Sequence, residues 1–326
     1  MQTPPRRIEI AHLPTPLERA ERLEAAWGGP TIWIKRDDLT GFGLSGNKVR
    51  KLEYHLAAAI DAGARTVITC GAVQSNHSRA TALAAARIGL GCILYLRSPG
   101  GQPPSDIDGN YLLQRLAGAE CRFITAEQYA DRDRIMAAAG ERAGRAWVIP
   151  EGASDPLGMW GFAIAVEELG AQLHSNGLSD VSVWHAAMSA GTTAGFVFGA
   201  QRSRLDGLHI IGCSVGDPAD AVVDRVDAIL ADARARYGSS DSPSSYEITD
   251  AHVGNGYGIA TSEELAVQME ATRRTGLLFD PTYTGKALFG LREEIRRGRF
   301  GIDDTVVFWH TGGGFAVFAH DWDGVV

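Results

Sequence analysis

Short β-branched segments alternate with longer segments of helical periodicity along almost the whole chain. Strands are predicted at 31–38, 66–71, 92–97, 120–125, 146–150, 181–188, 208–215 and 305–313. Helices are predicted at 47–63, 78–89, 109–118, 161–173, 194–205, 220–237, 262–276 and 285–298. Strands joined by helices form βαβ units, so the sequence predicts an α/β fold with mostly parallel sheets covered on both faces. A solvated loop is expected at 238–245.

The size and charge of the chain exclude several classes of function. Its 326 residues correspond to about two domains, and because no long linker separates two halves, one domain is expected to be inserted into the other. The formal net charge of −8 argues against a nucleic acid or an anionic membrane as partner. No apolar run approaches the ~20 residues that cross a bilayer, and the first residues lack the apolar core of a signal peptide. The cysteines are widely spaced, which predicts a reducing, cytoplasmic location and no metal site.

Lysines are rare among the basic residues, and this limits any chemistry that needs a primary amine. The candidates are Lys35, Lys48, Lys51 and Lys286. Lys48 follows a glycine-containing turn and begins a predicted helix, where the helix dipole and desolvation both lower the pKa of an amine. A lysine so placed suits the role of a Schiff-base nucleophile. The alternative is an exposed lysine in a first helical turn, and position alone favours that alternative.

Three strand-to-helix turns are rich in small and hydroxylic residues, and ligands of open α/β sheets bind at such turns. In SAGTTAG (189–195), small residues before a helix suit a phosphate monoester, unless they only allow close packing. In QSNHS (74–78), the polar residues suit a carboxylate, although Ser75 or Asn76 alone would simply cap a helix. His310 and Thr311 precede three glycines, and a lone histidine there is more often a hydrogen-bonded core residue than a catalyst.

Several motifs resemble those of the fold-type II pyridoxal-phosphate (PLP) enzymes of the tryptophan-synthase β superfamily. The similarity is greatest to the branch of D-cysteine desulfhydrase and 1-aminocyclopropane-1-carboxylate deaminase. The motifs are SGNKVRKLEY (45–54), QSNHSRATALAA (74–85), SAGTTAG (189–195), GYGI (256–259), DPTYTGKALFGL (280–291) and FWHTGGGF (308–315). The resemblance implies two open, twisted, mostly parallel sheets flanked by helices. It also implies a large PLP-binding domain of residues 1–51 and 161–326, a small inserted α/β domain of residues 52–160, and a homodimer.

The resemblance also assigns roles to individual residues. Lys48 is expected to bind PLP covalently and to act as the catalytic base. Asn76 is expected to contact the phenolic oxygen of the cofactor, and Ser75, Asn76 and His77 to hold the substrate carboxylate. The phosphate is expected among Gly191, Thr192, Thr193, Ala194 and Gly195, and Tyr257 and Tyr283 are expected to face the substrate.

Thr284 and Thr311 occupy the two positions that separate the activities of this branch. The deaminases carry Glu and Leu there, whereas the desulfhydrases carry small hydroxyl residues. A carboxylate beside the ring nitrogen of PLP keeps it protonated and makes the ring a deep electron sink, which helps to open a cyclopropane. A neutral hydroxyl leaves the nitrogen largely unprotonated, and this suffices when a good leaving group departs from the β-carbon. The threonines therefore favour β-elimination, with D-cysteine converted to pyruvate, sulfide and ammonia.

Met188, Thr193 and Ser45 depart from the pattern of the family, and each is expected to lie near enough to the cofactor to reshape the pocket. The alternative functions within the fold are 1-aminocyclopropane-1-carboxylate deaminase and L-cysteate sulfo-lyase. A more distant alternative is a non-catalytic amino-acid-binding relative, and the combination of Lys48, Asn76 and Tyr283 argues against it.

Overall fold

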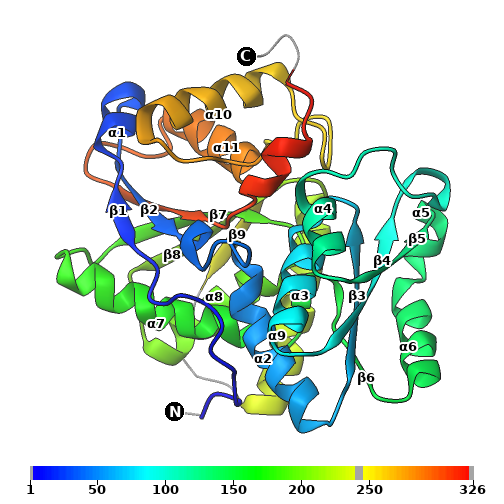
Figure 1. The fold of residues 1–326 in the computed structure, drawn as a ribbon. Coiled ribbons are helices and arrows are strands. Elements are labelled where there is room, and N and C mark those ends of the chain that lie inside the picture. The colour runs from blue at the N-terminus through cyan, green and yellow to red at the C-terminus, as the bar shows by residue number, and fades with distance from the viewer. Residues whose placement is uncertain (1–2, 239–244, 323–326) are drawn as a thin grey trace.

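Two sheets lie side by side and form the framework of the molecule (Figure 1). The computed structural model describes residues 3–238 and 245–322, so most of the loop expected at 238–245 lies outside the described residues. The larger sheet has the order β1-β2-β10-β7-β8-β9, formed by Leu17–Arg19, Thr31–Arg36, Thr305–His310, Val181–Ala187, Leu208–Ser214 and Tyr246–Thr249. The smaller sheet has the order β5-β4-β3-β6, formed by Glu120–Ile124, Gly91–Arg97, Thr66–Ala72 and Ala146–Val148. All pairs of neighbouring strands are parallel except β1 and β2, which confirms the predicted α/β fold.

Helices cover both faces of each sheet, as the buried clusters show. On the larger sheet, α7 (Trp160–Ser175), α8 (Gly191–Ser203) and α9 (Ala219–Tyr237) cover one face, and α1 (Glu21–Trp27), α10 (Ser262–Thr275) and α11 (Thr284–Arg296) cover the other. On the smaller sheet, α2 (Lys48–Asp61), α3 (Asn76–Arg87) and α4 (Gly109–Leu116) pack on one face, and α5 (Ala126–Ala130) and α6 (Arg132–Ala143) on the other. Short 3₁₀ turns are η1 (Asp37–Leu39), η2 (Pro99–Gly101), η3 (Glu151–Ala153) and η4 (Gly314–Ala319).

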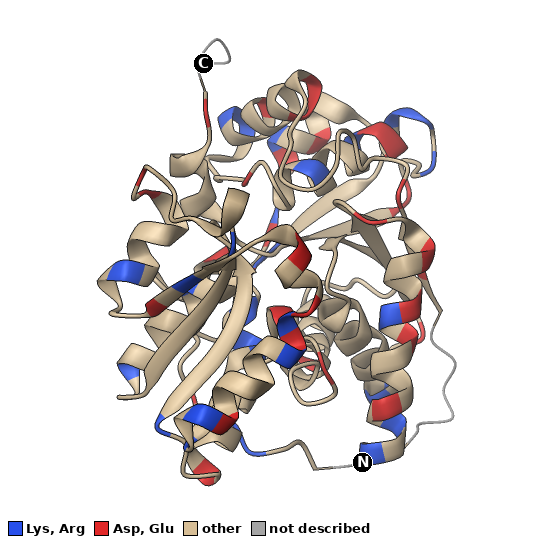
Figure 2. Cartoon of the chain, turned by 90° about the vertical axis from the view of Figure 1, so that its right-hand side faces the viewer, with Lys and Arg blue, Asp and Glu red and all other residues tan. Residues whose placement is uncertain are grey.

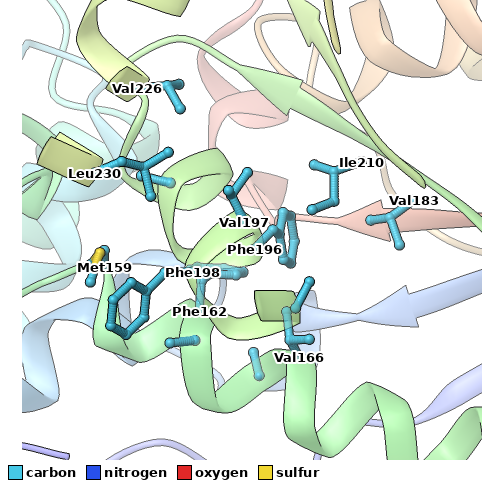
Figure 3. Close-up of a cluster of buried hydrophobic side chains, with 14 of the residues drawn as sticks. Met159, Phe162, Val166, Val183, Phe196, Val197, Phe198, Ile210, Val226 and Leu230 are labelled. Atoms are coloured by element: carbon cyan, nitrogen blue, oxygen red, sulfur yellow. The ribbon is translucent and has the colours of Figure 1, made fainter. Parts of the chain in front are cut away.

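The largest buried cluster lies where α7, α8 and α9 meet the larger sheet (Figure 3). Phe162 of α7 packs edge-to-face on Phe196 of α8, with ring centroids 5.0 Å apart. The two helices approach closely because a Cβ at Gly195 would lie 2.4 Å from the Cβ of Phe162, and one at Gly199 would lie 2.6 Å from the carbonyl oxygen of Ala163. Small residues in α8 therefore serve this packing, and it fixes the helix whose N-terminus faces the candidate site.

A buried ionic network anchors the start of α2 to the larger sheet. The Arg50 guanidinium donates to Asp37 (Nε to Oδ2, 2.9 Å) and to Glu168 of α7 (Nη1 to Oε2, 3.0 Å). Lys35 of β2 donates to the same Glu168 carboxylate and to Gln172 (2.8 Å). The Arg50 and Lys35 cations outweigh the effect of burial and lower the pKa of Glu168 to about 2, so the network remains charged. Lys35 is thus a structural ion-pair partner, and α2 is fixed two residues after Lys48.

Several elements have no counterpart among the predicted segments. β1 and β9 are short edge strands of the larger sheet, and α1, α5 and α6 are short or polar helices. α6 buries only Met136 and Ala139, so its sequence gives little amphipathic signal. The structure also begins α3 at Asn76 and α8 at Gly191, earlier than predicted, which places turn residues in the first turns of these helices.

The smaller sheet is formed entirely by strands between residues 66 and 148, within the predicted small domain of 52–160. The predicted boundary between residues 51 and 52 falls inside α2, which packs against both α3 and α7. The domain limits therefore remain a prediction. In the described part of the chain, no helix combines the length and the apolar character needed to span a bilayer.

Candidate active site

The carboxyl ends of strands from both sheets converge on one cavity of about 360 Å³. β3 leads to Ser75, Asn76 and His77, β7 to the segment 186–190, and β10 to Thr311, and all of these residues line the cavity. The start of α2 contributes Asn47 and Lys48. Two tyrosines, Tyr257 and Tyr283, also line the cavity. The structure thus brings together nine of the residues predicted for the site: Lys48, Ser75, Asn76, His77, Thr192, Thr193, Tyr257, Tyr283 and Thr311.

Lys48 lies in this cavity, partly buried, rather than projecting into solvent from its helix. The preceding turn is tight, because Gly46 has φ +108° and a Cβ there would lie 2.8 Å from the carbonyl oxygen of Thr311. Asn47 N–H donates to that same carbonyl (3.0 Å), which fixes the start of α2 beside the end of β10. Burial lowers the pKa of the Lys48 amine to about 8, against an opposing effect of the Glu151 carboxylate. The amine is therefore available as a neutral nucleophile near physiological pH.

Lys51 lies one turn further along α2 and is fully buried. Its Nζ donates to Ser154 Oγ (3.1 Å), and Ser154 Oγ donates to Ser189 Oγ (2.9 Å) at the end of β7. Burial and the neighbouring Lys48 lower the pKa of Lys51 well below its ordinary value. Lys35 and Lys286 each pair with a buried glutamate, whereas Lys51 has no carboxylate partner within the described residues. Lys51 does not itself line the cavity, but Ser154 connects it to Ser189, which does. Such an amine is suited to an anionic ligand, and its i, i+3 spacing from Lys48 was the available sequence signal.

The N-terminus of α8 faces the cavity next to Lys51. Ala190 has a left-handed backbone (φ +67°), and no side chain caps the helix. Thr192 and Thr193 line the cavity, so their main-chain N–H groups and hydroxyls lie at a helix N-terminus, which favours an anion. Gly191, Ala194 and Gly195, which were predicted for the same role, are buried but do not line the cavity.

These three residues make packing contacts, as the alternative interpretation of the segment proposed, and their role toward a phosphate stays a prediction. Ala194 N–H already donates to the carbonyl of Ala190 (2.9 Å), and Gly195 contacts α7. A Cβ on Gly191 would lie 2.7 Å from Ser154 Oγ, so glycine here allows the serine to approach the helix N-terminus. The segment therefore combines a ligand-facing part with a packing part.

The turn at residues 75–78 presents donors to the cavity. Ser75 caps α3, since its Oγ accepts from Ser78 N–H (3.2 Å), and its own hydroxyl hydrogen remains able to donate. Asn76 Oδ1 accepts from Asn110 Nδ2 (3.0 Å), so the Asn76 side-chain amide keeps its donors. These donors, together with the N-terminus of α3, suit a carboxylate.

His77 differs from the prediction for its side chain. Thr69 Oγ1 donates to the carbonyl of Ile149 (2.8 Å), so the 2.8 Å contact of Thr69 with His77 Nε2 requires the hydrogen on Nε2. Burial lowers the pKa of His77 well below its ordinary value, which keeps the ring neutral and leaves Nδ1 as an unpartnered acceptor among the described residues. An acceptor cannot bind a carboxylate, so only the main-chain N–H of His77 remains suited to that role.

The hydroxyl oxygens of Tyr257 and Tyr283 lie 2.6 Å apart at the cavity wall. Burial raises the pKa of each phenol, and each also experiences the neighbouring hydroxyl. Tyr283 N–H donates to Asp280 Oδ2 (2.8 Å), which fixes its main chain before α11. The pair therefore presents neutral hydroxyl groups that are held in place by their mutual hydrogen bond. Such hydroxyls are suited to donate or share a proton.

Thr284 and Thr311, which were both predicted to lie at the cofactor, have different environments. Thr311 lines the cavity. Thr284 is fully buried, and its hydroxyl donates to Asp280 Oδ1 (2.7 Å) and accepts from Asp280 N–H (2.8 Å). Because its single hydrogen is engaged by Asp280, Thr284 does not present a donor to the cavity. His310 is a core residue, stacked on Phe279 at 4.8 Å and bonded to the carbonyl of Leu278 (3.0 Å).

Of the three residues that depart from the family pattern, Met188 and Thr193 line the cavity, as expected. Ser45 does not line it, and its effect on the pocket stays a prediction. Its Oγ donates to the carbonyl of Asp38 (2.8 Å), which is a contact within the turn before α2. No group of three or more His, Cys, Asp or Glu side chains in the described ranges is placed to hold a metal ion.

Six charged or phenolic side chains of the cavity were missed by the sequence analysis: Arg97, Tyr129, Arg132, Glu151, Asp217 and Arg225. Arg97, Glu151 and Asp217 lie at or just after the carboxyl ends of β4, β6 and β8, so the rule that found the first three turns also applies to them. Tyr129, Arg132 and Arg225 lie on α5, α6 and α9 instead. Tyr129 Oη donates to Glu151 Oε1 (2.7 Å), and Arg132 pairs with Glu151 (3.1 Å). We refer to the six residues together as the outer wall of the cavity.

The chemistry of this donor set fits PLP. An amine with a lowered pKa, Lys48, is suited to its aldehyde, and Lys51 and the N-terminus of α8 are suited to its phosphate. His77 Nδ1 lies at the cavity and has no protein partner among the described residues, so it is open to a ligand.

Comparisons with known proteins identify the family of the chain. The pyridoxal-phosphate dependent enzyme family matches residues 8–312. A putative 1-aminocyclopropane-1-carboxylate deaminase of Thermotoga maritima is 37% identical over 96% of this chain and 98% of its own length. The bifunctional D-cysteine desulfhydrase/1-aminocyclopropane-1-carboxylate deaminase of Arabidopsis thaliana is 38% identical over 95% of this chain and 79% of the plant protein. The D-cysteine desulfhydrase of Yersinia enterocolitica is 36% identical over 96% of each chain.

Solved structures agree with the fold. The crystal structure of an ACC deaminase homologue superposes with a TM-score of 0.85 at 33% identity, covering 97% of this chain and 94% of that one. A fungal L-serine ammonia-lyase from Rhizomucor miehei shares the fold at a TM-score of 0.65 and 17% identity, over 94% of this chain and 95% of that one. The chain therefore belongs to the pyridoxal-phosphate dependent enzyme family, with the fold-type II architecture and PLP as its cofactor.

Proposed function

We propose that this enzyme is a β-eliminating lyase that acts on a small amino acid, with D-cysteine as the leading substrate. The observation that carries the proposal is the single cavity in which Lys48, the Ser75 turn and the Tyr257–Tyr283 hydroxyl pair face one another. Curated relatives named D-cysteine desulfhydrase support the choice of substrate. We further propose a cytoplasmic homodimer.

Different residues of the cavity are suited to bind the cofactor and the substrate. Lys48 would bind PLP, Lys51 and the α8 N-terminus would hold its phosphate, and Asn76 and Thr311 would contact the rest of the cofactor. Bound PLP supplies an electron sink for the negative charge that forms on the substrate α-carbon. Ser75 and Asn76 donate to the substrate carboxylate and orient the α-carbon.

Proton transfer is the task of Lys48 and the tyrosine pair. With its pKa lowered to about 8, Lys48 Nζ is suited to take the α-hydrogen. The bond between the β-carbon and sulfur then breaks, and its electron pair leaves with the sulfur as hydrosulfide. The Tyr257–Tyr283 pair donates a hydrogen bond to the leaving sulfur. Water completes the reaction, so that D-cysteine and water give pyruvate, hydrogen sulfide and ammonia.

The described environment favours elimination over opening of a cyclopropane ring. Thr311 is the family-distinguishing residue that lines the cavity, and its hydroxyl is neutral. Asp280, the carboxylate nearest to Thr284, is occupied by four hydrogen bonds from residues 282–284. It is therefore committed to the start of α11 rather than to a cofactor nitrogen.

A substrate panel tests this proposal. The purified holoenzyme is offered D-cysteine, L-cysteine, cysteate, 3-chloroalanine and 1-aminocyclopropane-1-carboxylate, and pyruvate, sulfide, sulfite and 2-oxobutyrate are measured. Pyruvate and sulfide from D-cysteine support the proposal, whereas 2-oxobutyrate as the main product identifies a deaminase. A protein that lacks the absorbance of bound PLP, or that turns over none of these compounds, contradicts the proposal and favours a binding protein.

A further inference from the structure

The outer wall of the cavity carries an unbalanced positive charge. Arginines and carboxylates are otherwise paired there: Arg132 with Glu151 (3.1 Å) and Arg225 with Asp217 (2.6 Å). Arg97 lines the same cavity, and within residues 3–238 and 245–322 it has no carboxylate partner. The chain as a whole has a net charge of −8, and acidic and basic residues are interspersed along its elements (Figure 2). Arg97 is an exposed residue that also lines the cavity, so its guanidinium is accessible to a ligand there.

Aromatic contacts hold Arg97 in place without using its hydrogen-bond donors. Its guanidinium carbon lies 5.2 Å from the ring centre of Tyr129 and 6.0 Å from that of Tyr257. Both rings are fixed through their hydroxyls, Tyr129 by Glu151 (2.7 Å) and Tyr257 by Tyr283 (2.6 Å). The planar guanidinium, with five N–H donors, is thus positioned and left free to bind an oxyanion in a bidentate manner.

The other anions expected in the cavity already have their donors. The cofactor phosphate is matched by Lys51 and the N-terminus of α8, and the α-carboxylate of the substrate by the Ser75 turn. Arg97 ends β4, next to Ala72 at the end of β3, and it contacts Tyr257 of the hydroxyl pair. That pair faces the expected side chain of the substrate, so Arg97 is available for a charge at the side-chain end.

We propose that Arg97 forms a subsite for an anionic group on the β-carbon of the substrate, a sulfonate being the best match to its bidentate donors. This inference rests on the proposed β-elimination and narrows its substrate class. With a sulfonate, the bond between the β-carbon and sulfur breaks and its electron pair leaves with sulfite. The α-hydrogen passes to Lys48, and water releases pyruvate and ammonia, so cysteate and water give pyruvate, sulfite and ammonia.

Binding of unreactive ligands tests the subsite independently of turnover. The probes are 3-sulfopropanoate, which carries a carboxylate and a sulfonate but no amine, and propanoate, which lacks the sulfonate. Dissociation constants are measured by calorimetry on holoenzyme of the parent chain, of Arg97→Gln and of Arg122→Gln. Arg122 is the matched control, because it is a surface arginine of neighbouring β5 that pairs with Glu120 and does not line the cavity. Absorbance of bound PLP and thermal melting establish that each variant is folded and loaded.

The expected result is selective. Arg97→Gln weakens 3-sulfopropanoate binding about tenfold or more, since hydrogen bonds to a charged group are lost, and leaves propanoate binding unchanged. Arg122→Gln changes neither. Equal affinity for 3-sulfopropanoate in Arg97→Gln and the parent overturns the inference. An equal loss for both ligands also overturns it, because Arg97 would then bind the shared carboxylate.

Turnover separates this inference from the proposed function. Arg97→Gln is expected to lower kcat/KM for cysteate about tenfold or more, while kcat/KM for 3-chloroalanine, which has a neutral side chain, changes less than about twofold. If the parent enzyme turns over none of the compounds, the proposed function fails and the binding data still decide the subsite. If D-cysteine is turned over but Arg97→Gln binds 3-sulfopropanoate as tightly as the parent does, the proposed function holds and only the subsite is wrong.

Discussion

The Tyr257 and Tyr283 hydroxyl oxygens lie 2.6 Å apart, although the two residues come from different segments on either side of α10. One hydroxyl must donate to the other, so the pair presents a single free hydrogen to the cavity. Burial raises the pKa of both phenols, which keeps them protonated at neutral pH. The pair is therefore a proton donor rather than a base.

Removal of either hydroxyl should impair elimination. Tyr283→Phe and Tyr257→Phe are each expected to lower kcat about 10²-fold or more, in the range of lost general acid–base assistance. Steady-state kinetics with D-cysteine measures the effect. Tyr246→Phe is the control, because Tyr246 bonds to Asp227 at the surface and does not line the cavity. Full activity in both Tyr257→Phe and Tyr283→Phe would show that the pair has no chemical role.

Lys51 should determine the affinity for the cofactor rather than the chemistry. Lys51→Met removes a buried amine that contacts Ser154 and Lys48 and that a bound phosphate would hold in its protonated form. We expect the dissociation constant of PLP to rise about 10- to 100-fold, as for a lost charged hydrogen bond. Titration of apoenzyme with PLP, followed by absorbance, measures this constant. Ser154→Ala keeps the cation and should cause a smaller loss; unchanged affinity in Lys51→Met would remove Lys51 from the phosphate site.

Incorporation of PLP by apoenzyme should depend on pH through Lys48. The amine is protonated and unreactive below its pKa and neutral above it. Because burial lowers that pKa from 10.5 to about 8, the incorporation rate should rise through about pH 8 and level off above it. Glu151 opposes the shift, so Glu151→Gln should move the midpoint to lower pH. Asp217→Asn, which alters another carboxylate of the cavity, should leave the midpoint unchanged. A midpoint near 10.5 would contradict the buried position of Lys48.

Gly195 should act through packing and not through the cofactor. A Cβ there would lie 2.5 Å from the carbonyl oxygen of Met159 and closer still to Phe162, so α7 and α8 would have to separate. Gly195→Ala is expected to destabilise the protein by about 1–3 kcal/mol, as overpacking does, and denaturant unfolding measures this. Gly301→Ala, with its nearest atom 3.7 Å away, is the control. If Gly195→Ala is as stable as the parent but binds PLP poorly, Gly195 contributes to the phosphate site and the packing account is wrong.

The alternation of strands and helices made the fold predictable, because buried parallel strands and amphipathic helices leave distinct patterns. Elements without that pattern were missed. β1 is a three-residue edge strand, and α6 buries only two side chains. Their positions are decided by tertiary contacts that no local window contains.

Within the site, residues beside a recognisable turn were predictable, and those that depend on partners elsewhere in the chain were not. Lys48 and Ser75 follow turns whose chemistry is visible in the sequence. The orientation of Thr284 depends on Asp280, and the tautomer of His77 depends on Thr69 and Ile149. The role of Arg97 likewise becomes visible only when Tyr129 and Tyr257 lie on either side of it.

The attachment of the cofactor is the central claim, and one measurement tests it most directly. Holoenzyme is reduced with borohydride and digested, and tandem mass spectrometry locates the pyridoxyl group. Lys48 and Lys51 are three residues apart and their side chains are in contact, so the fragment ions must separate them. The structure predicts the adduct on Lys48 and none in Lys48→Ala. An adduct on Lys51, or on any other lysine of the parent chain, would contradict the account.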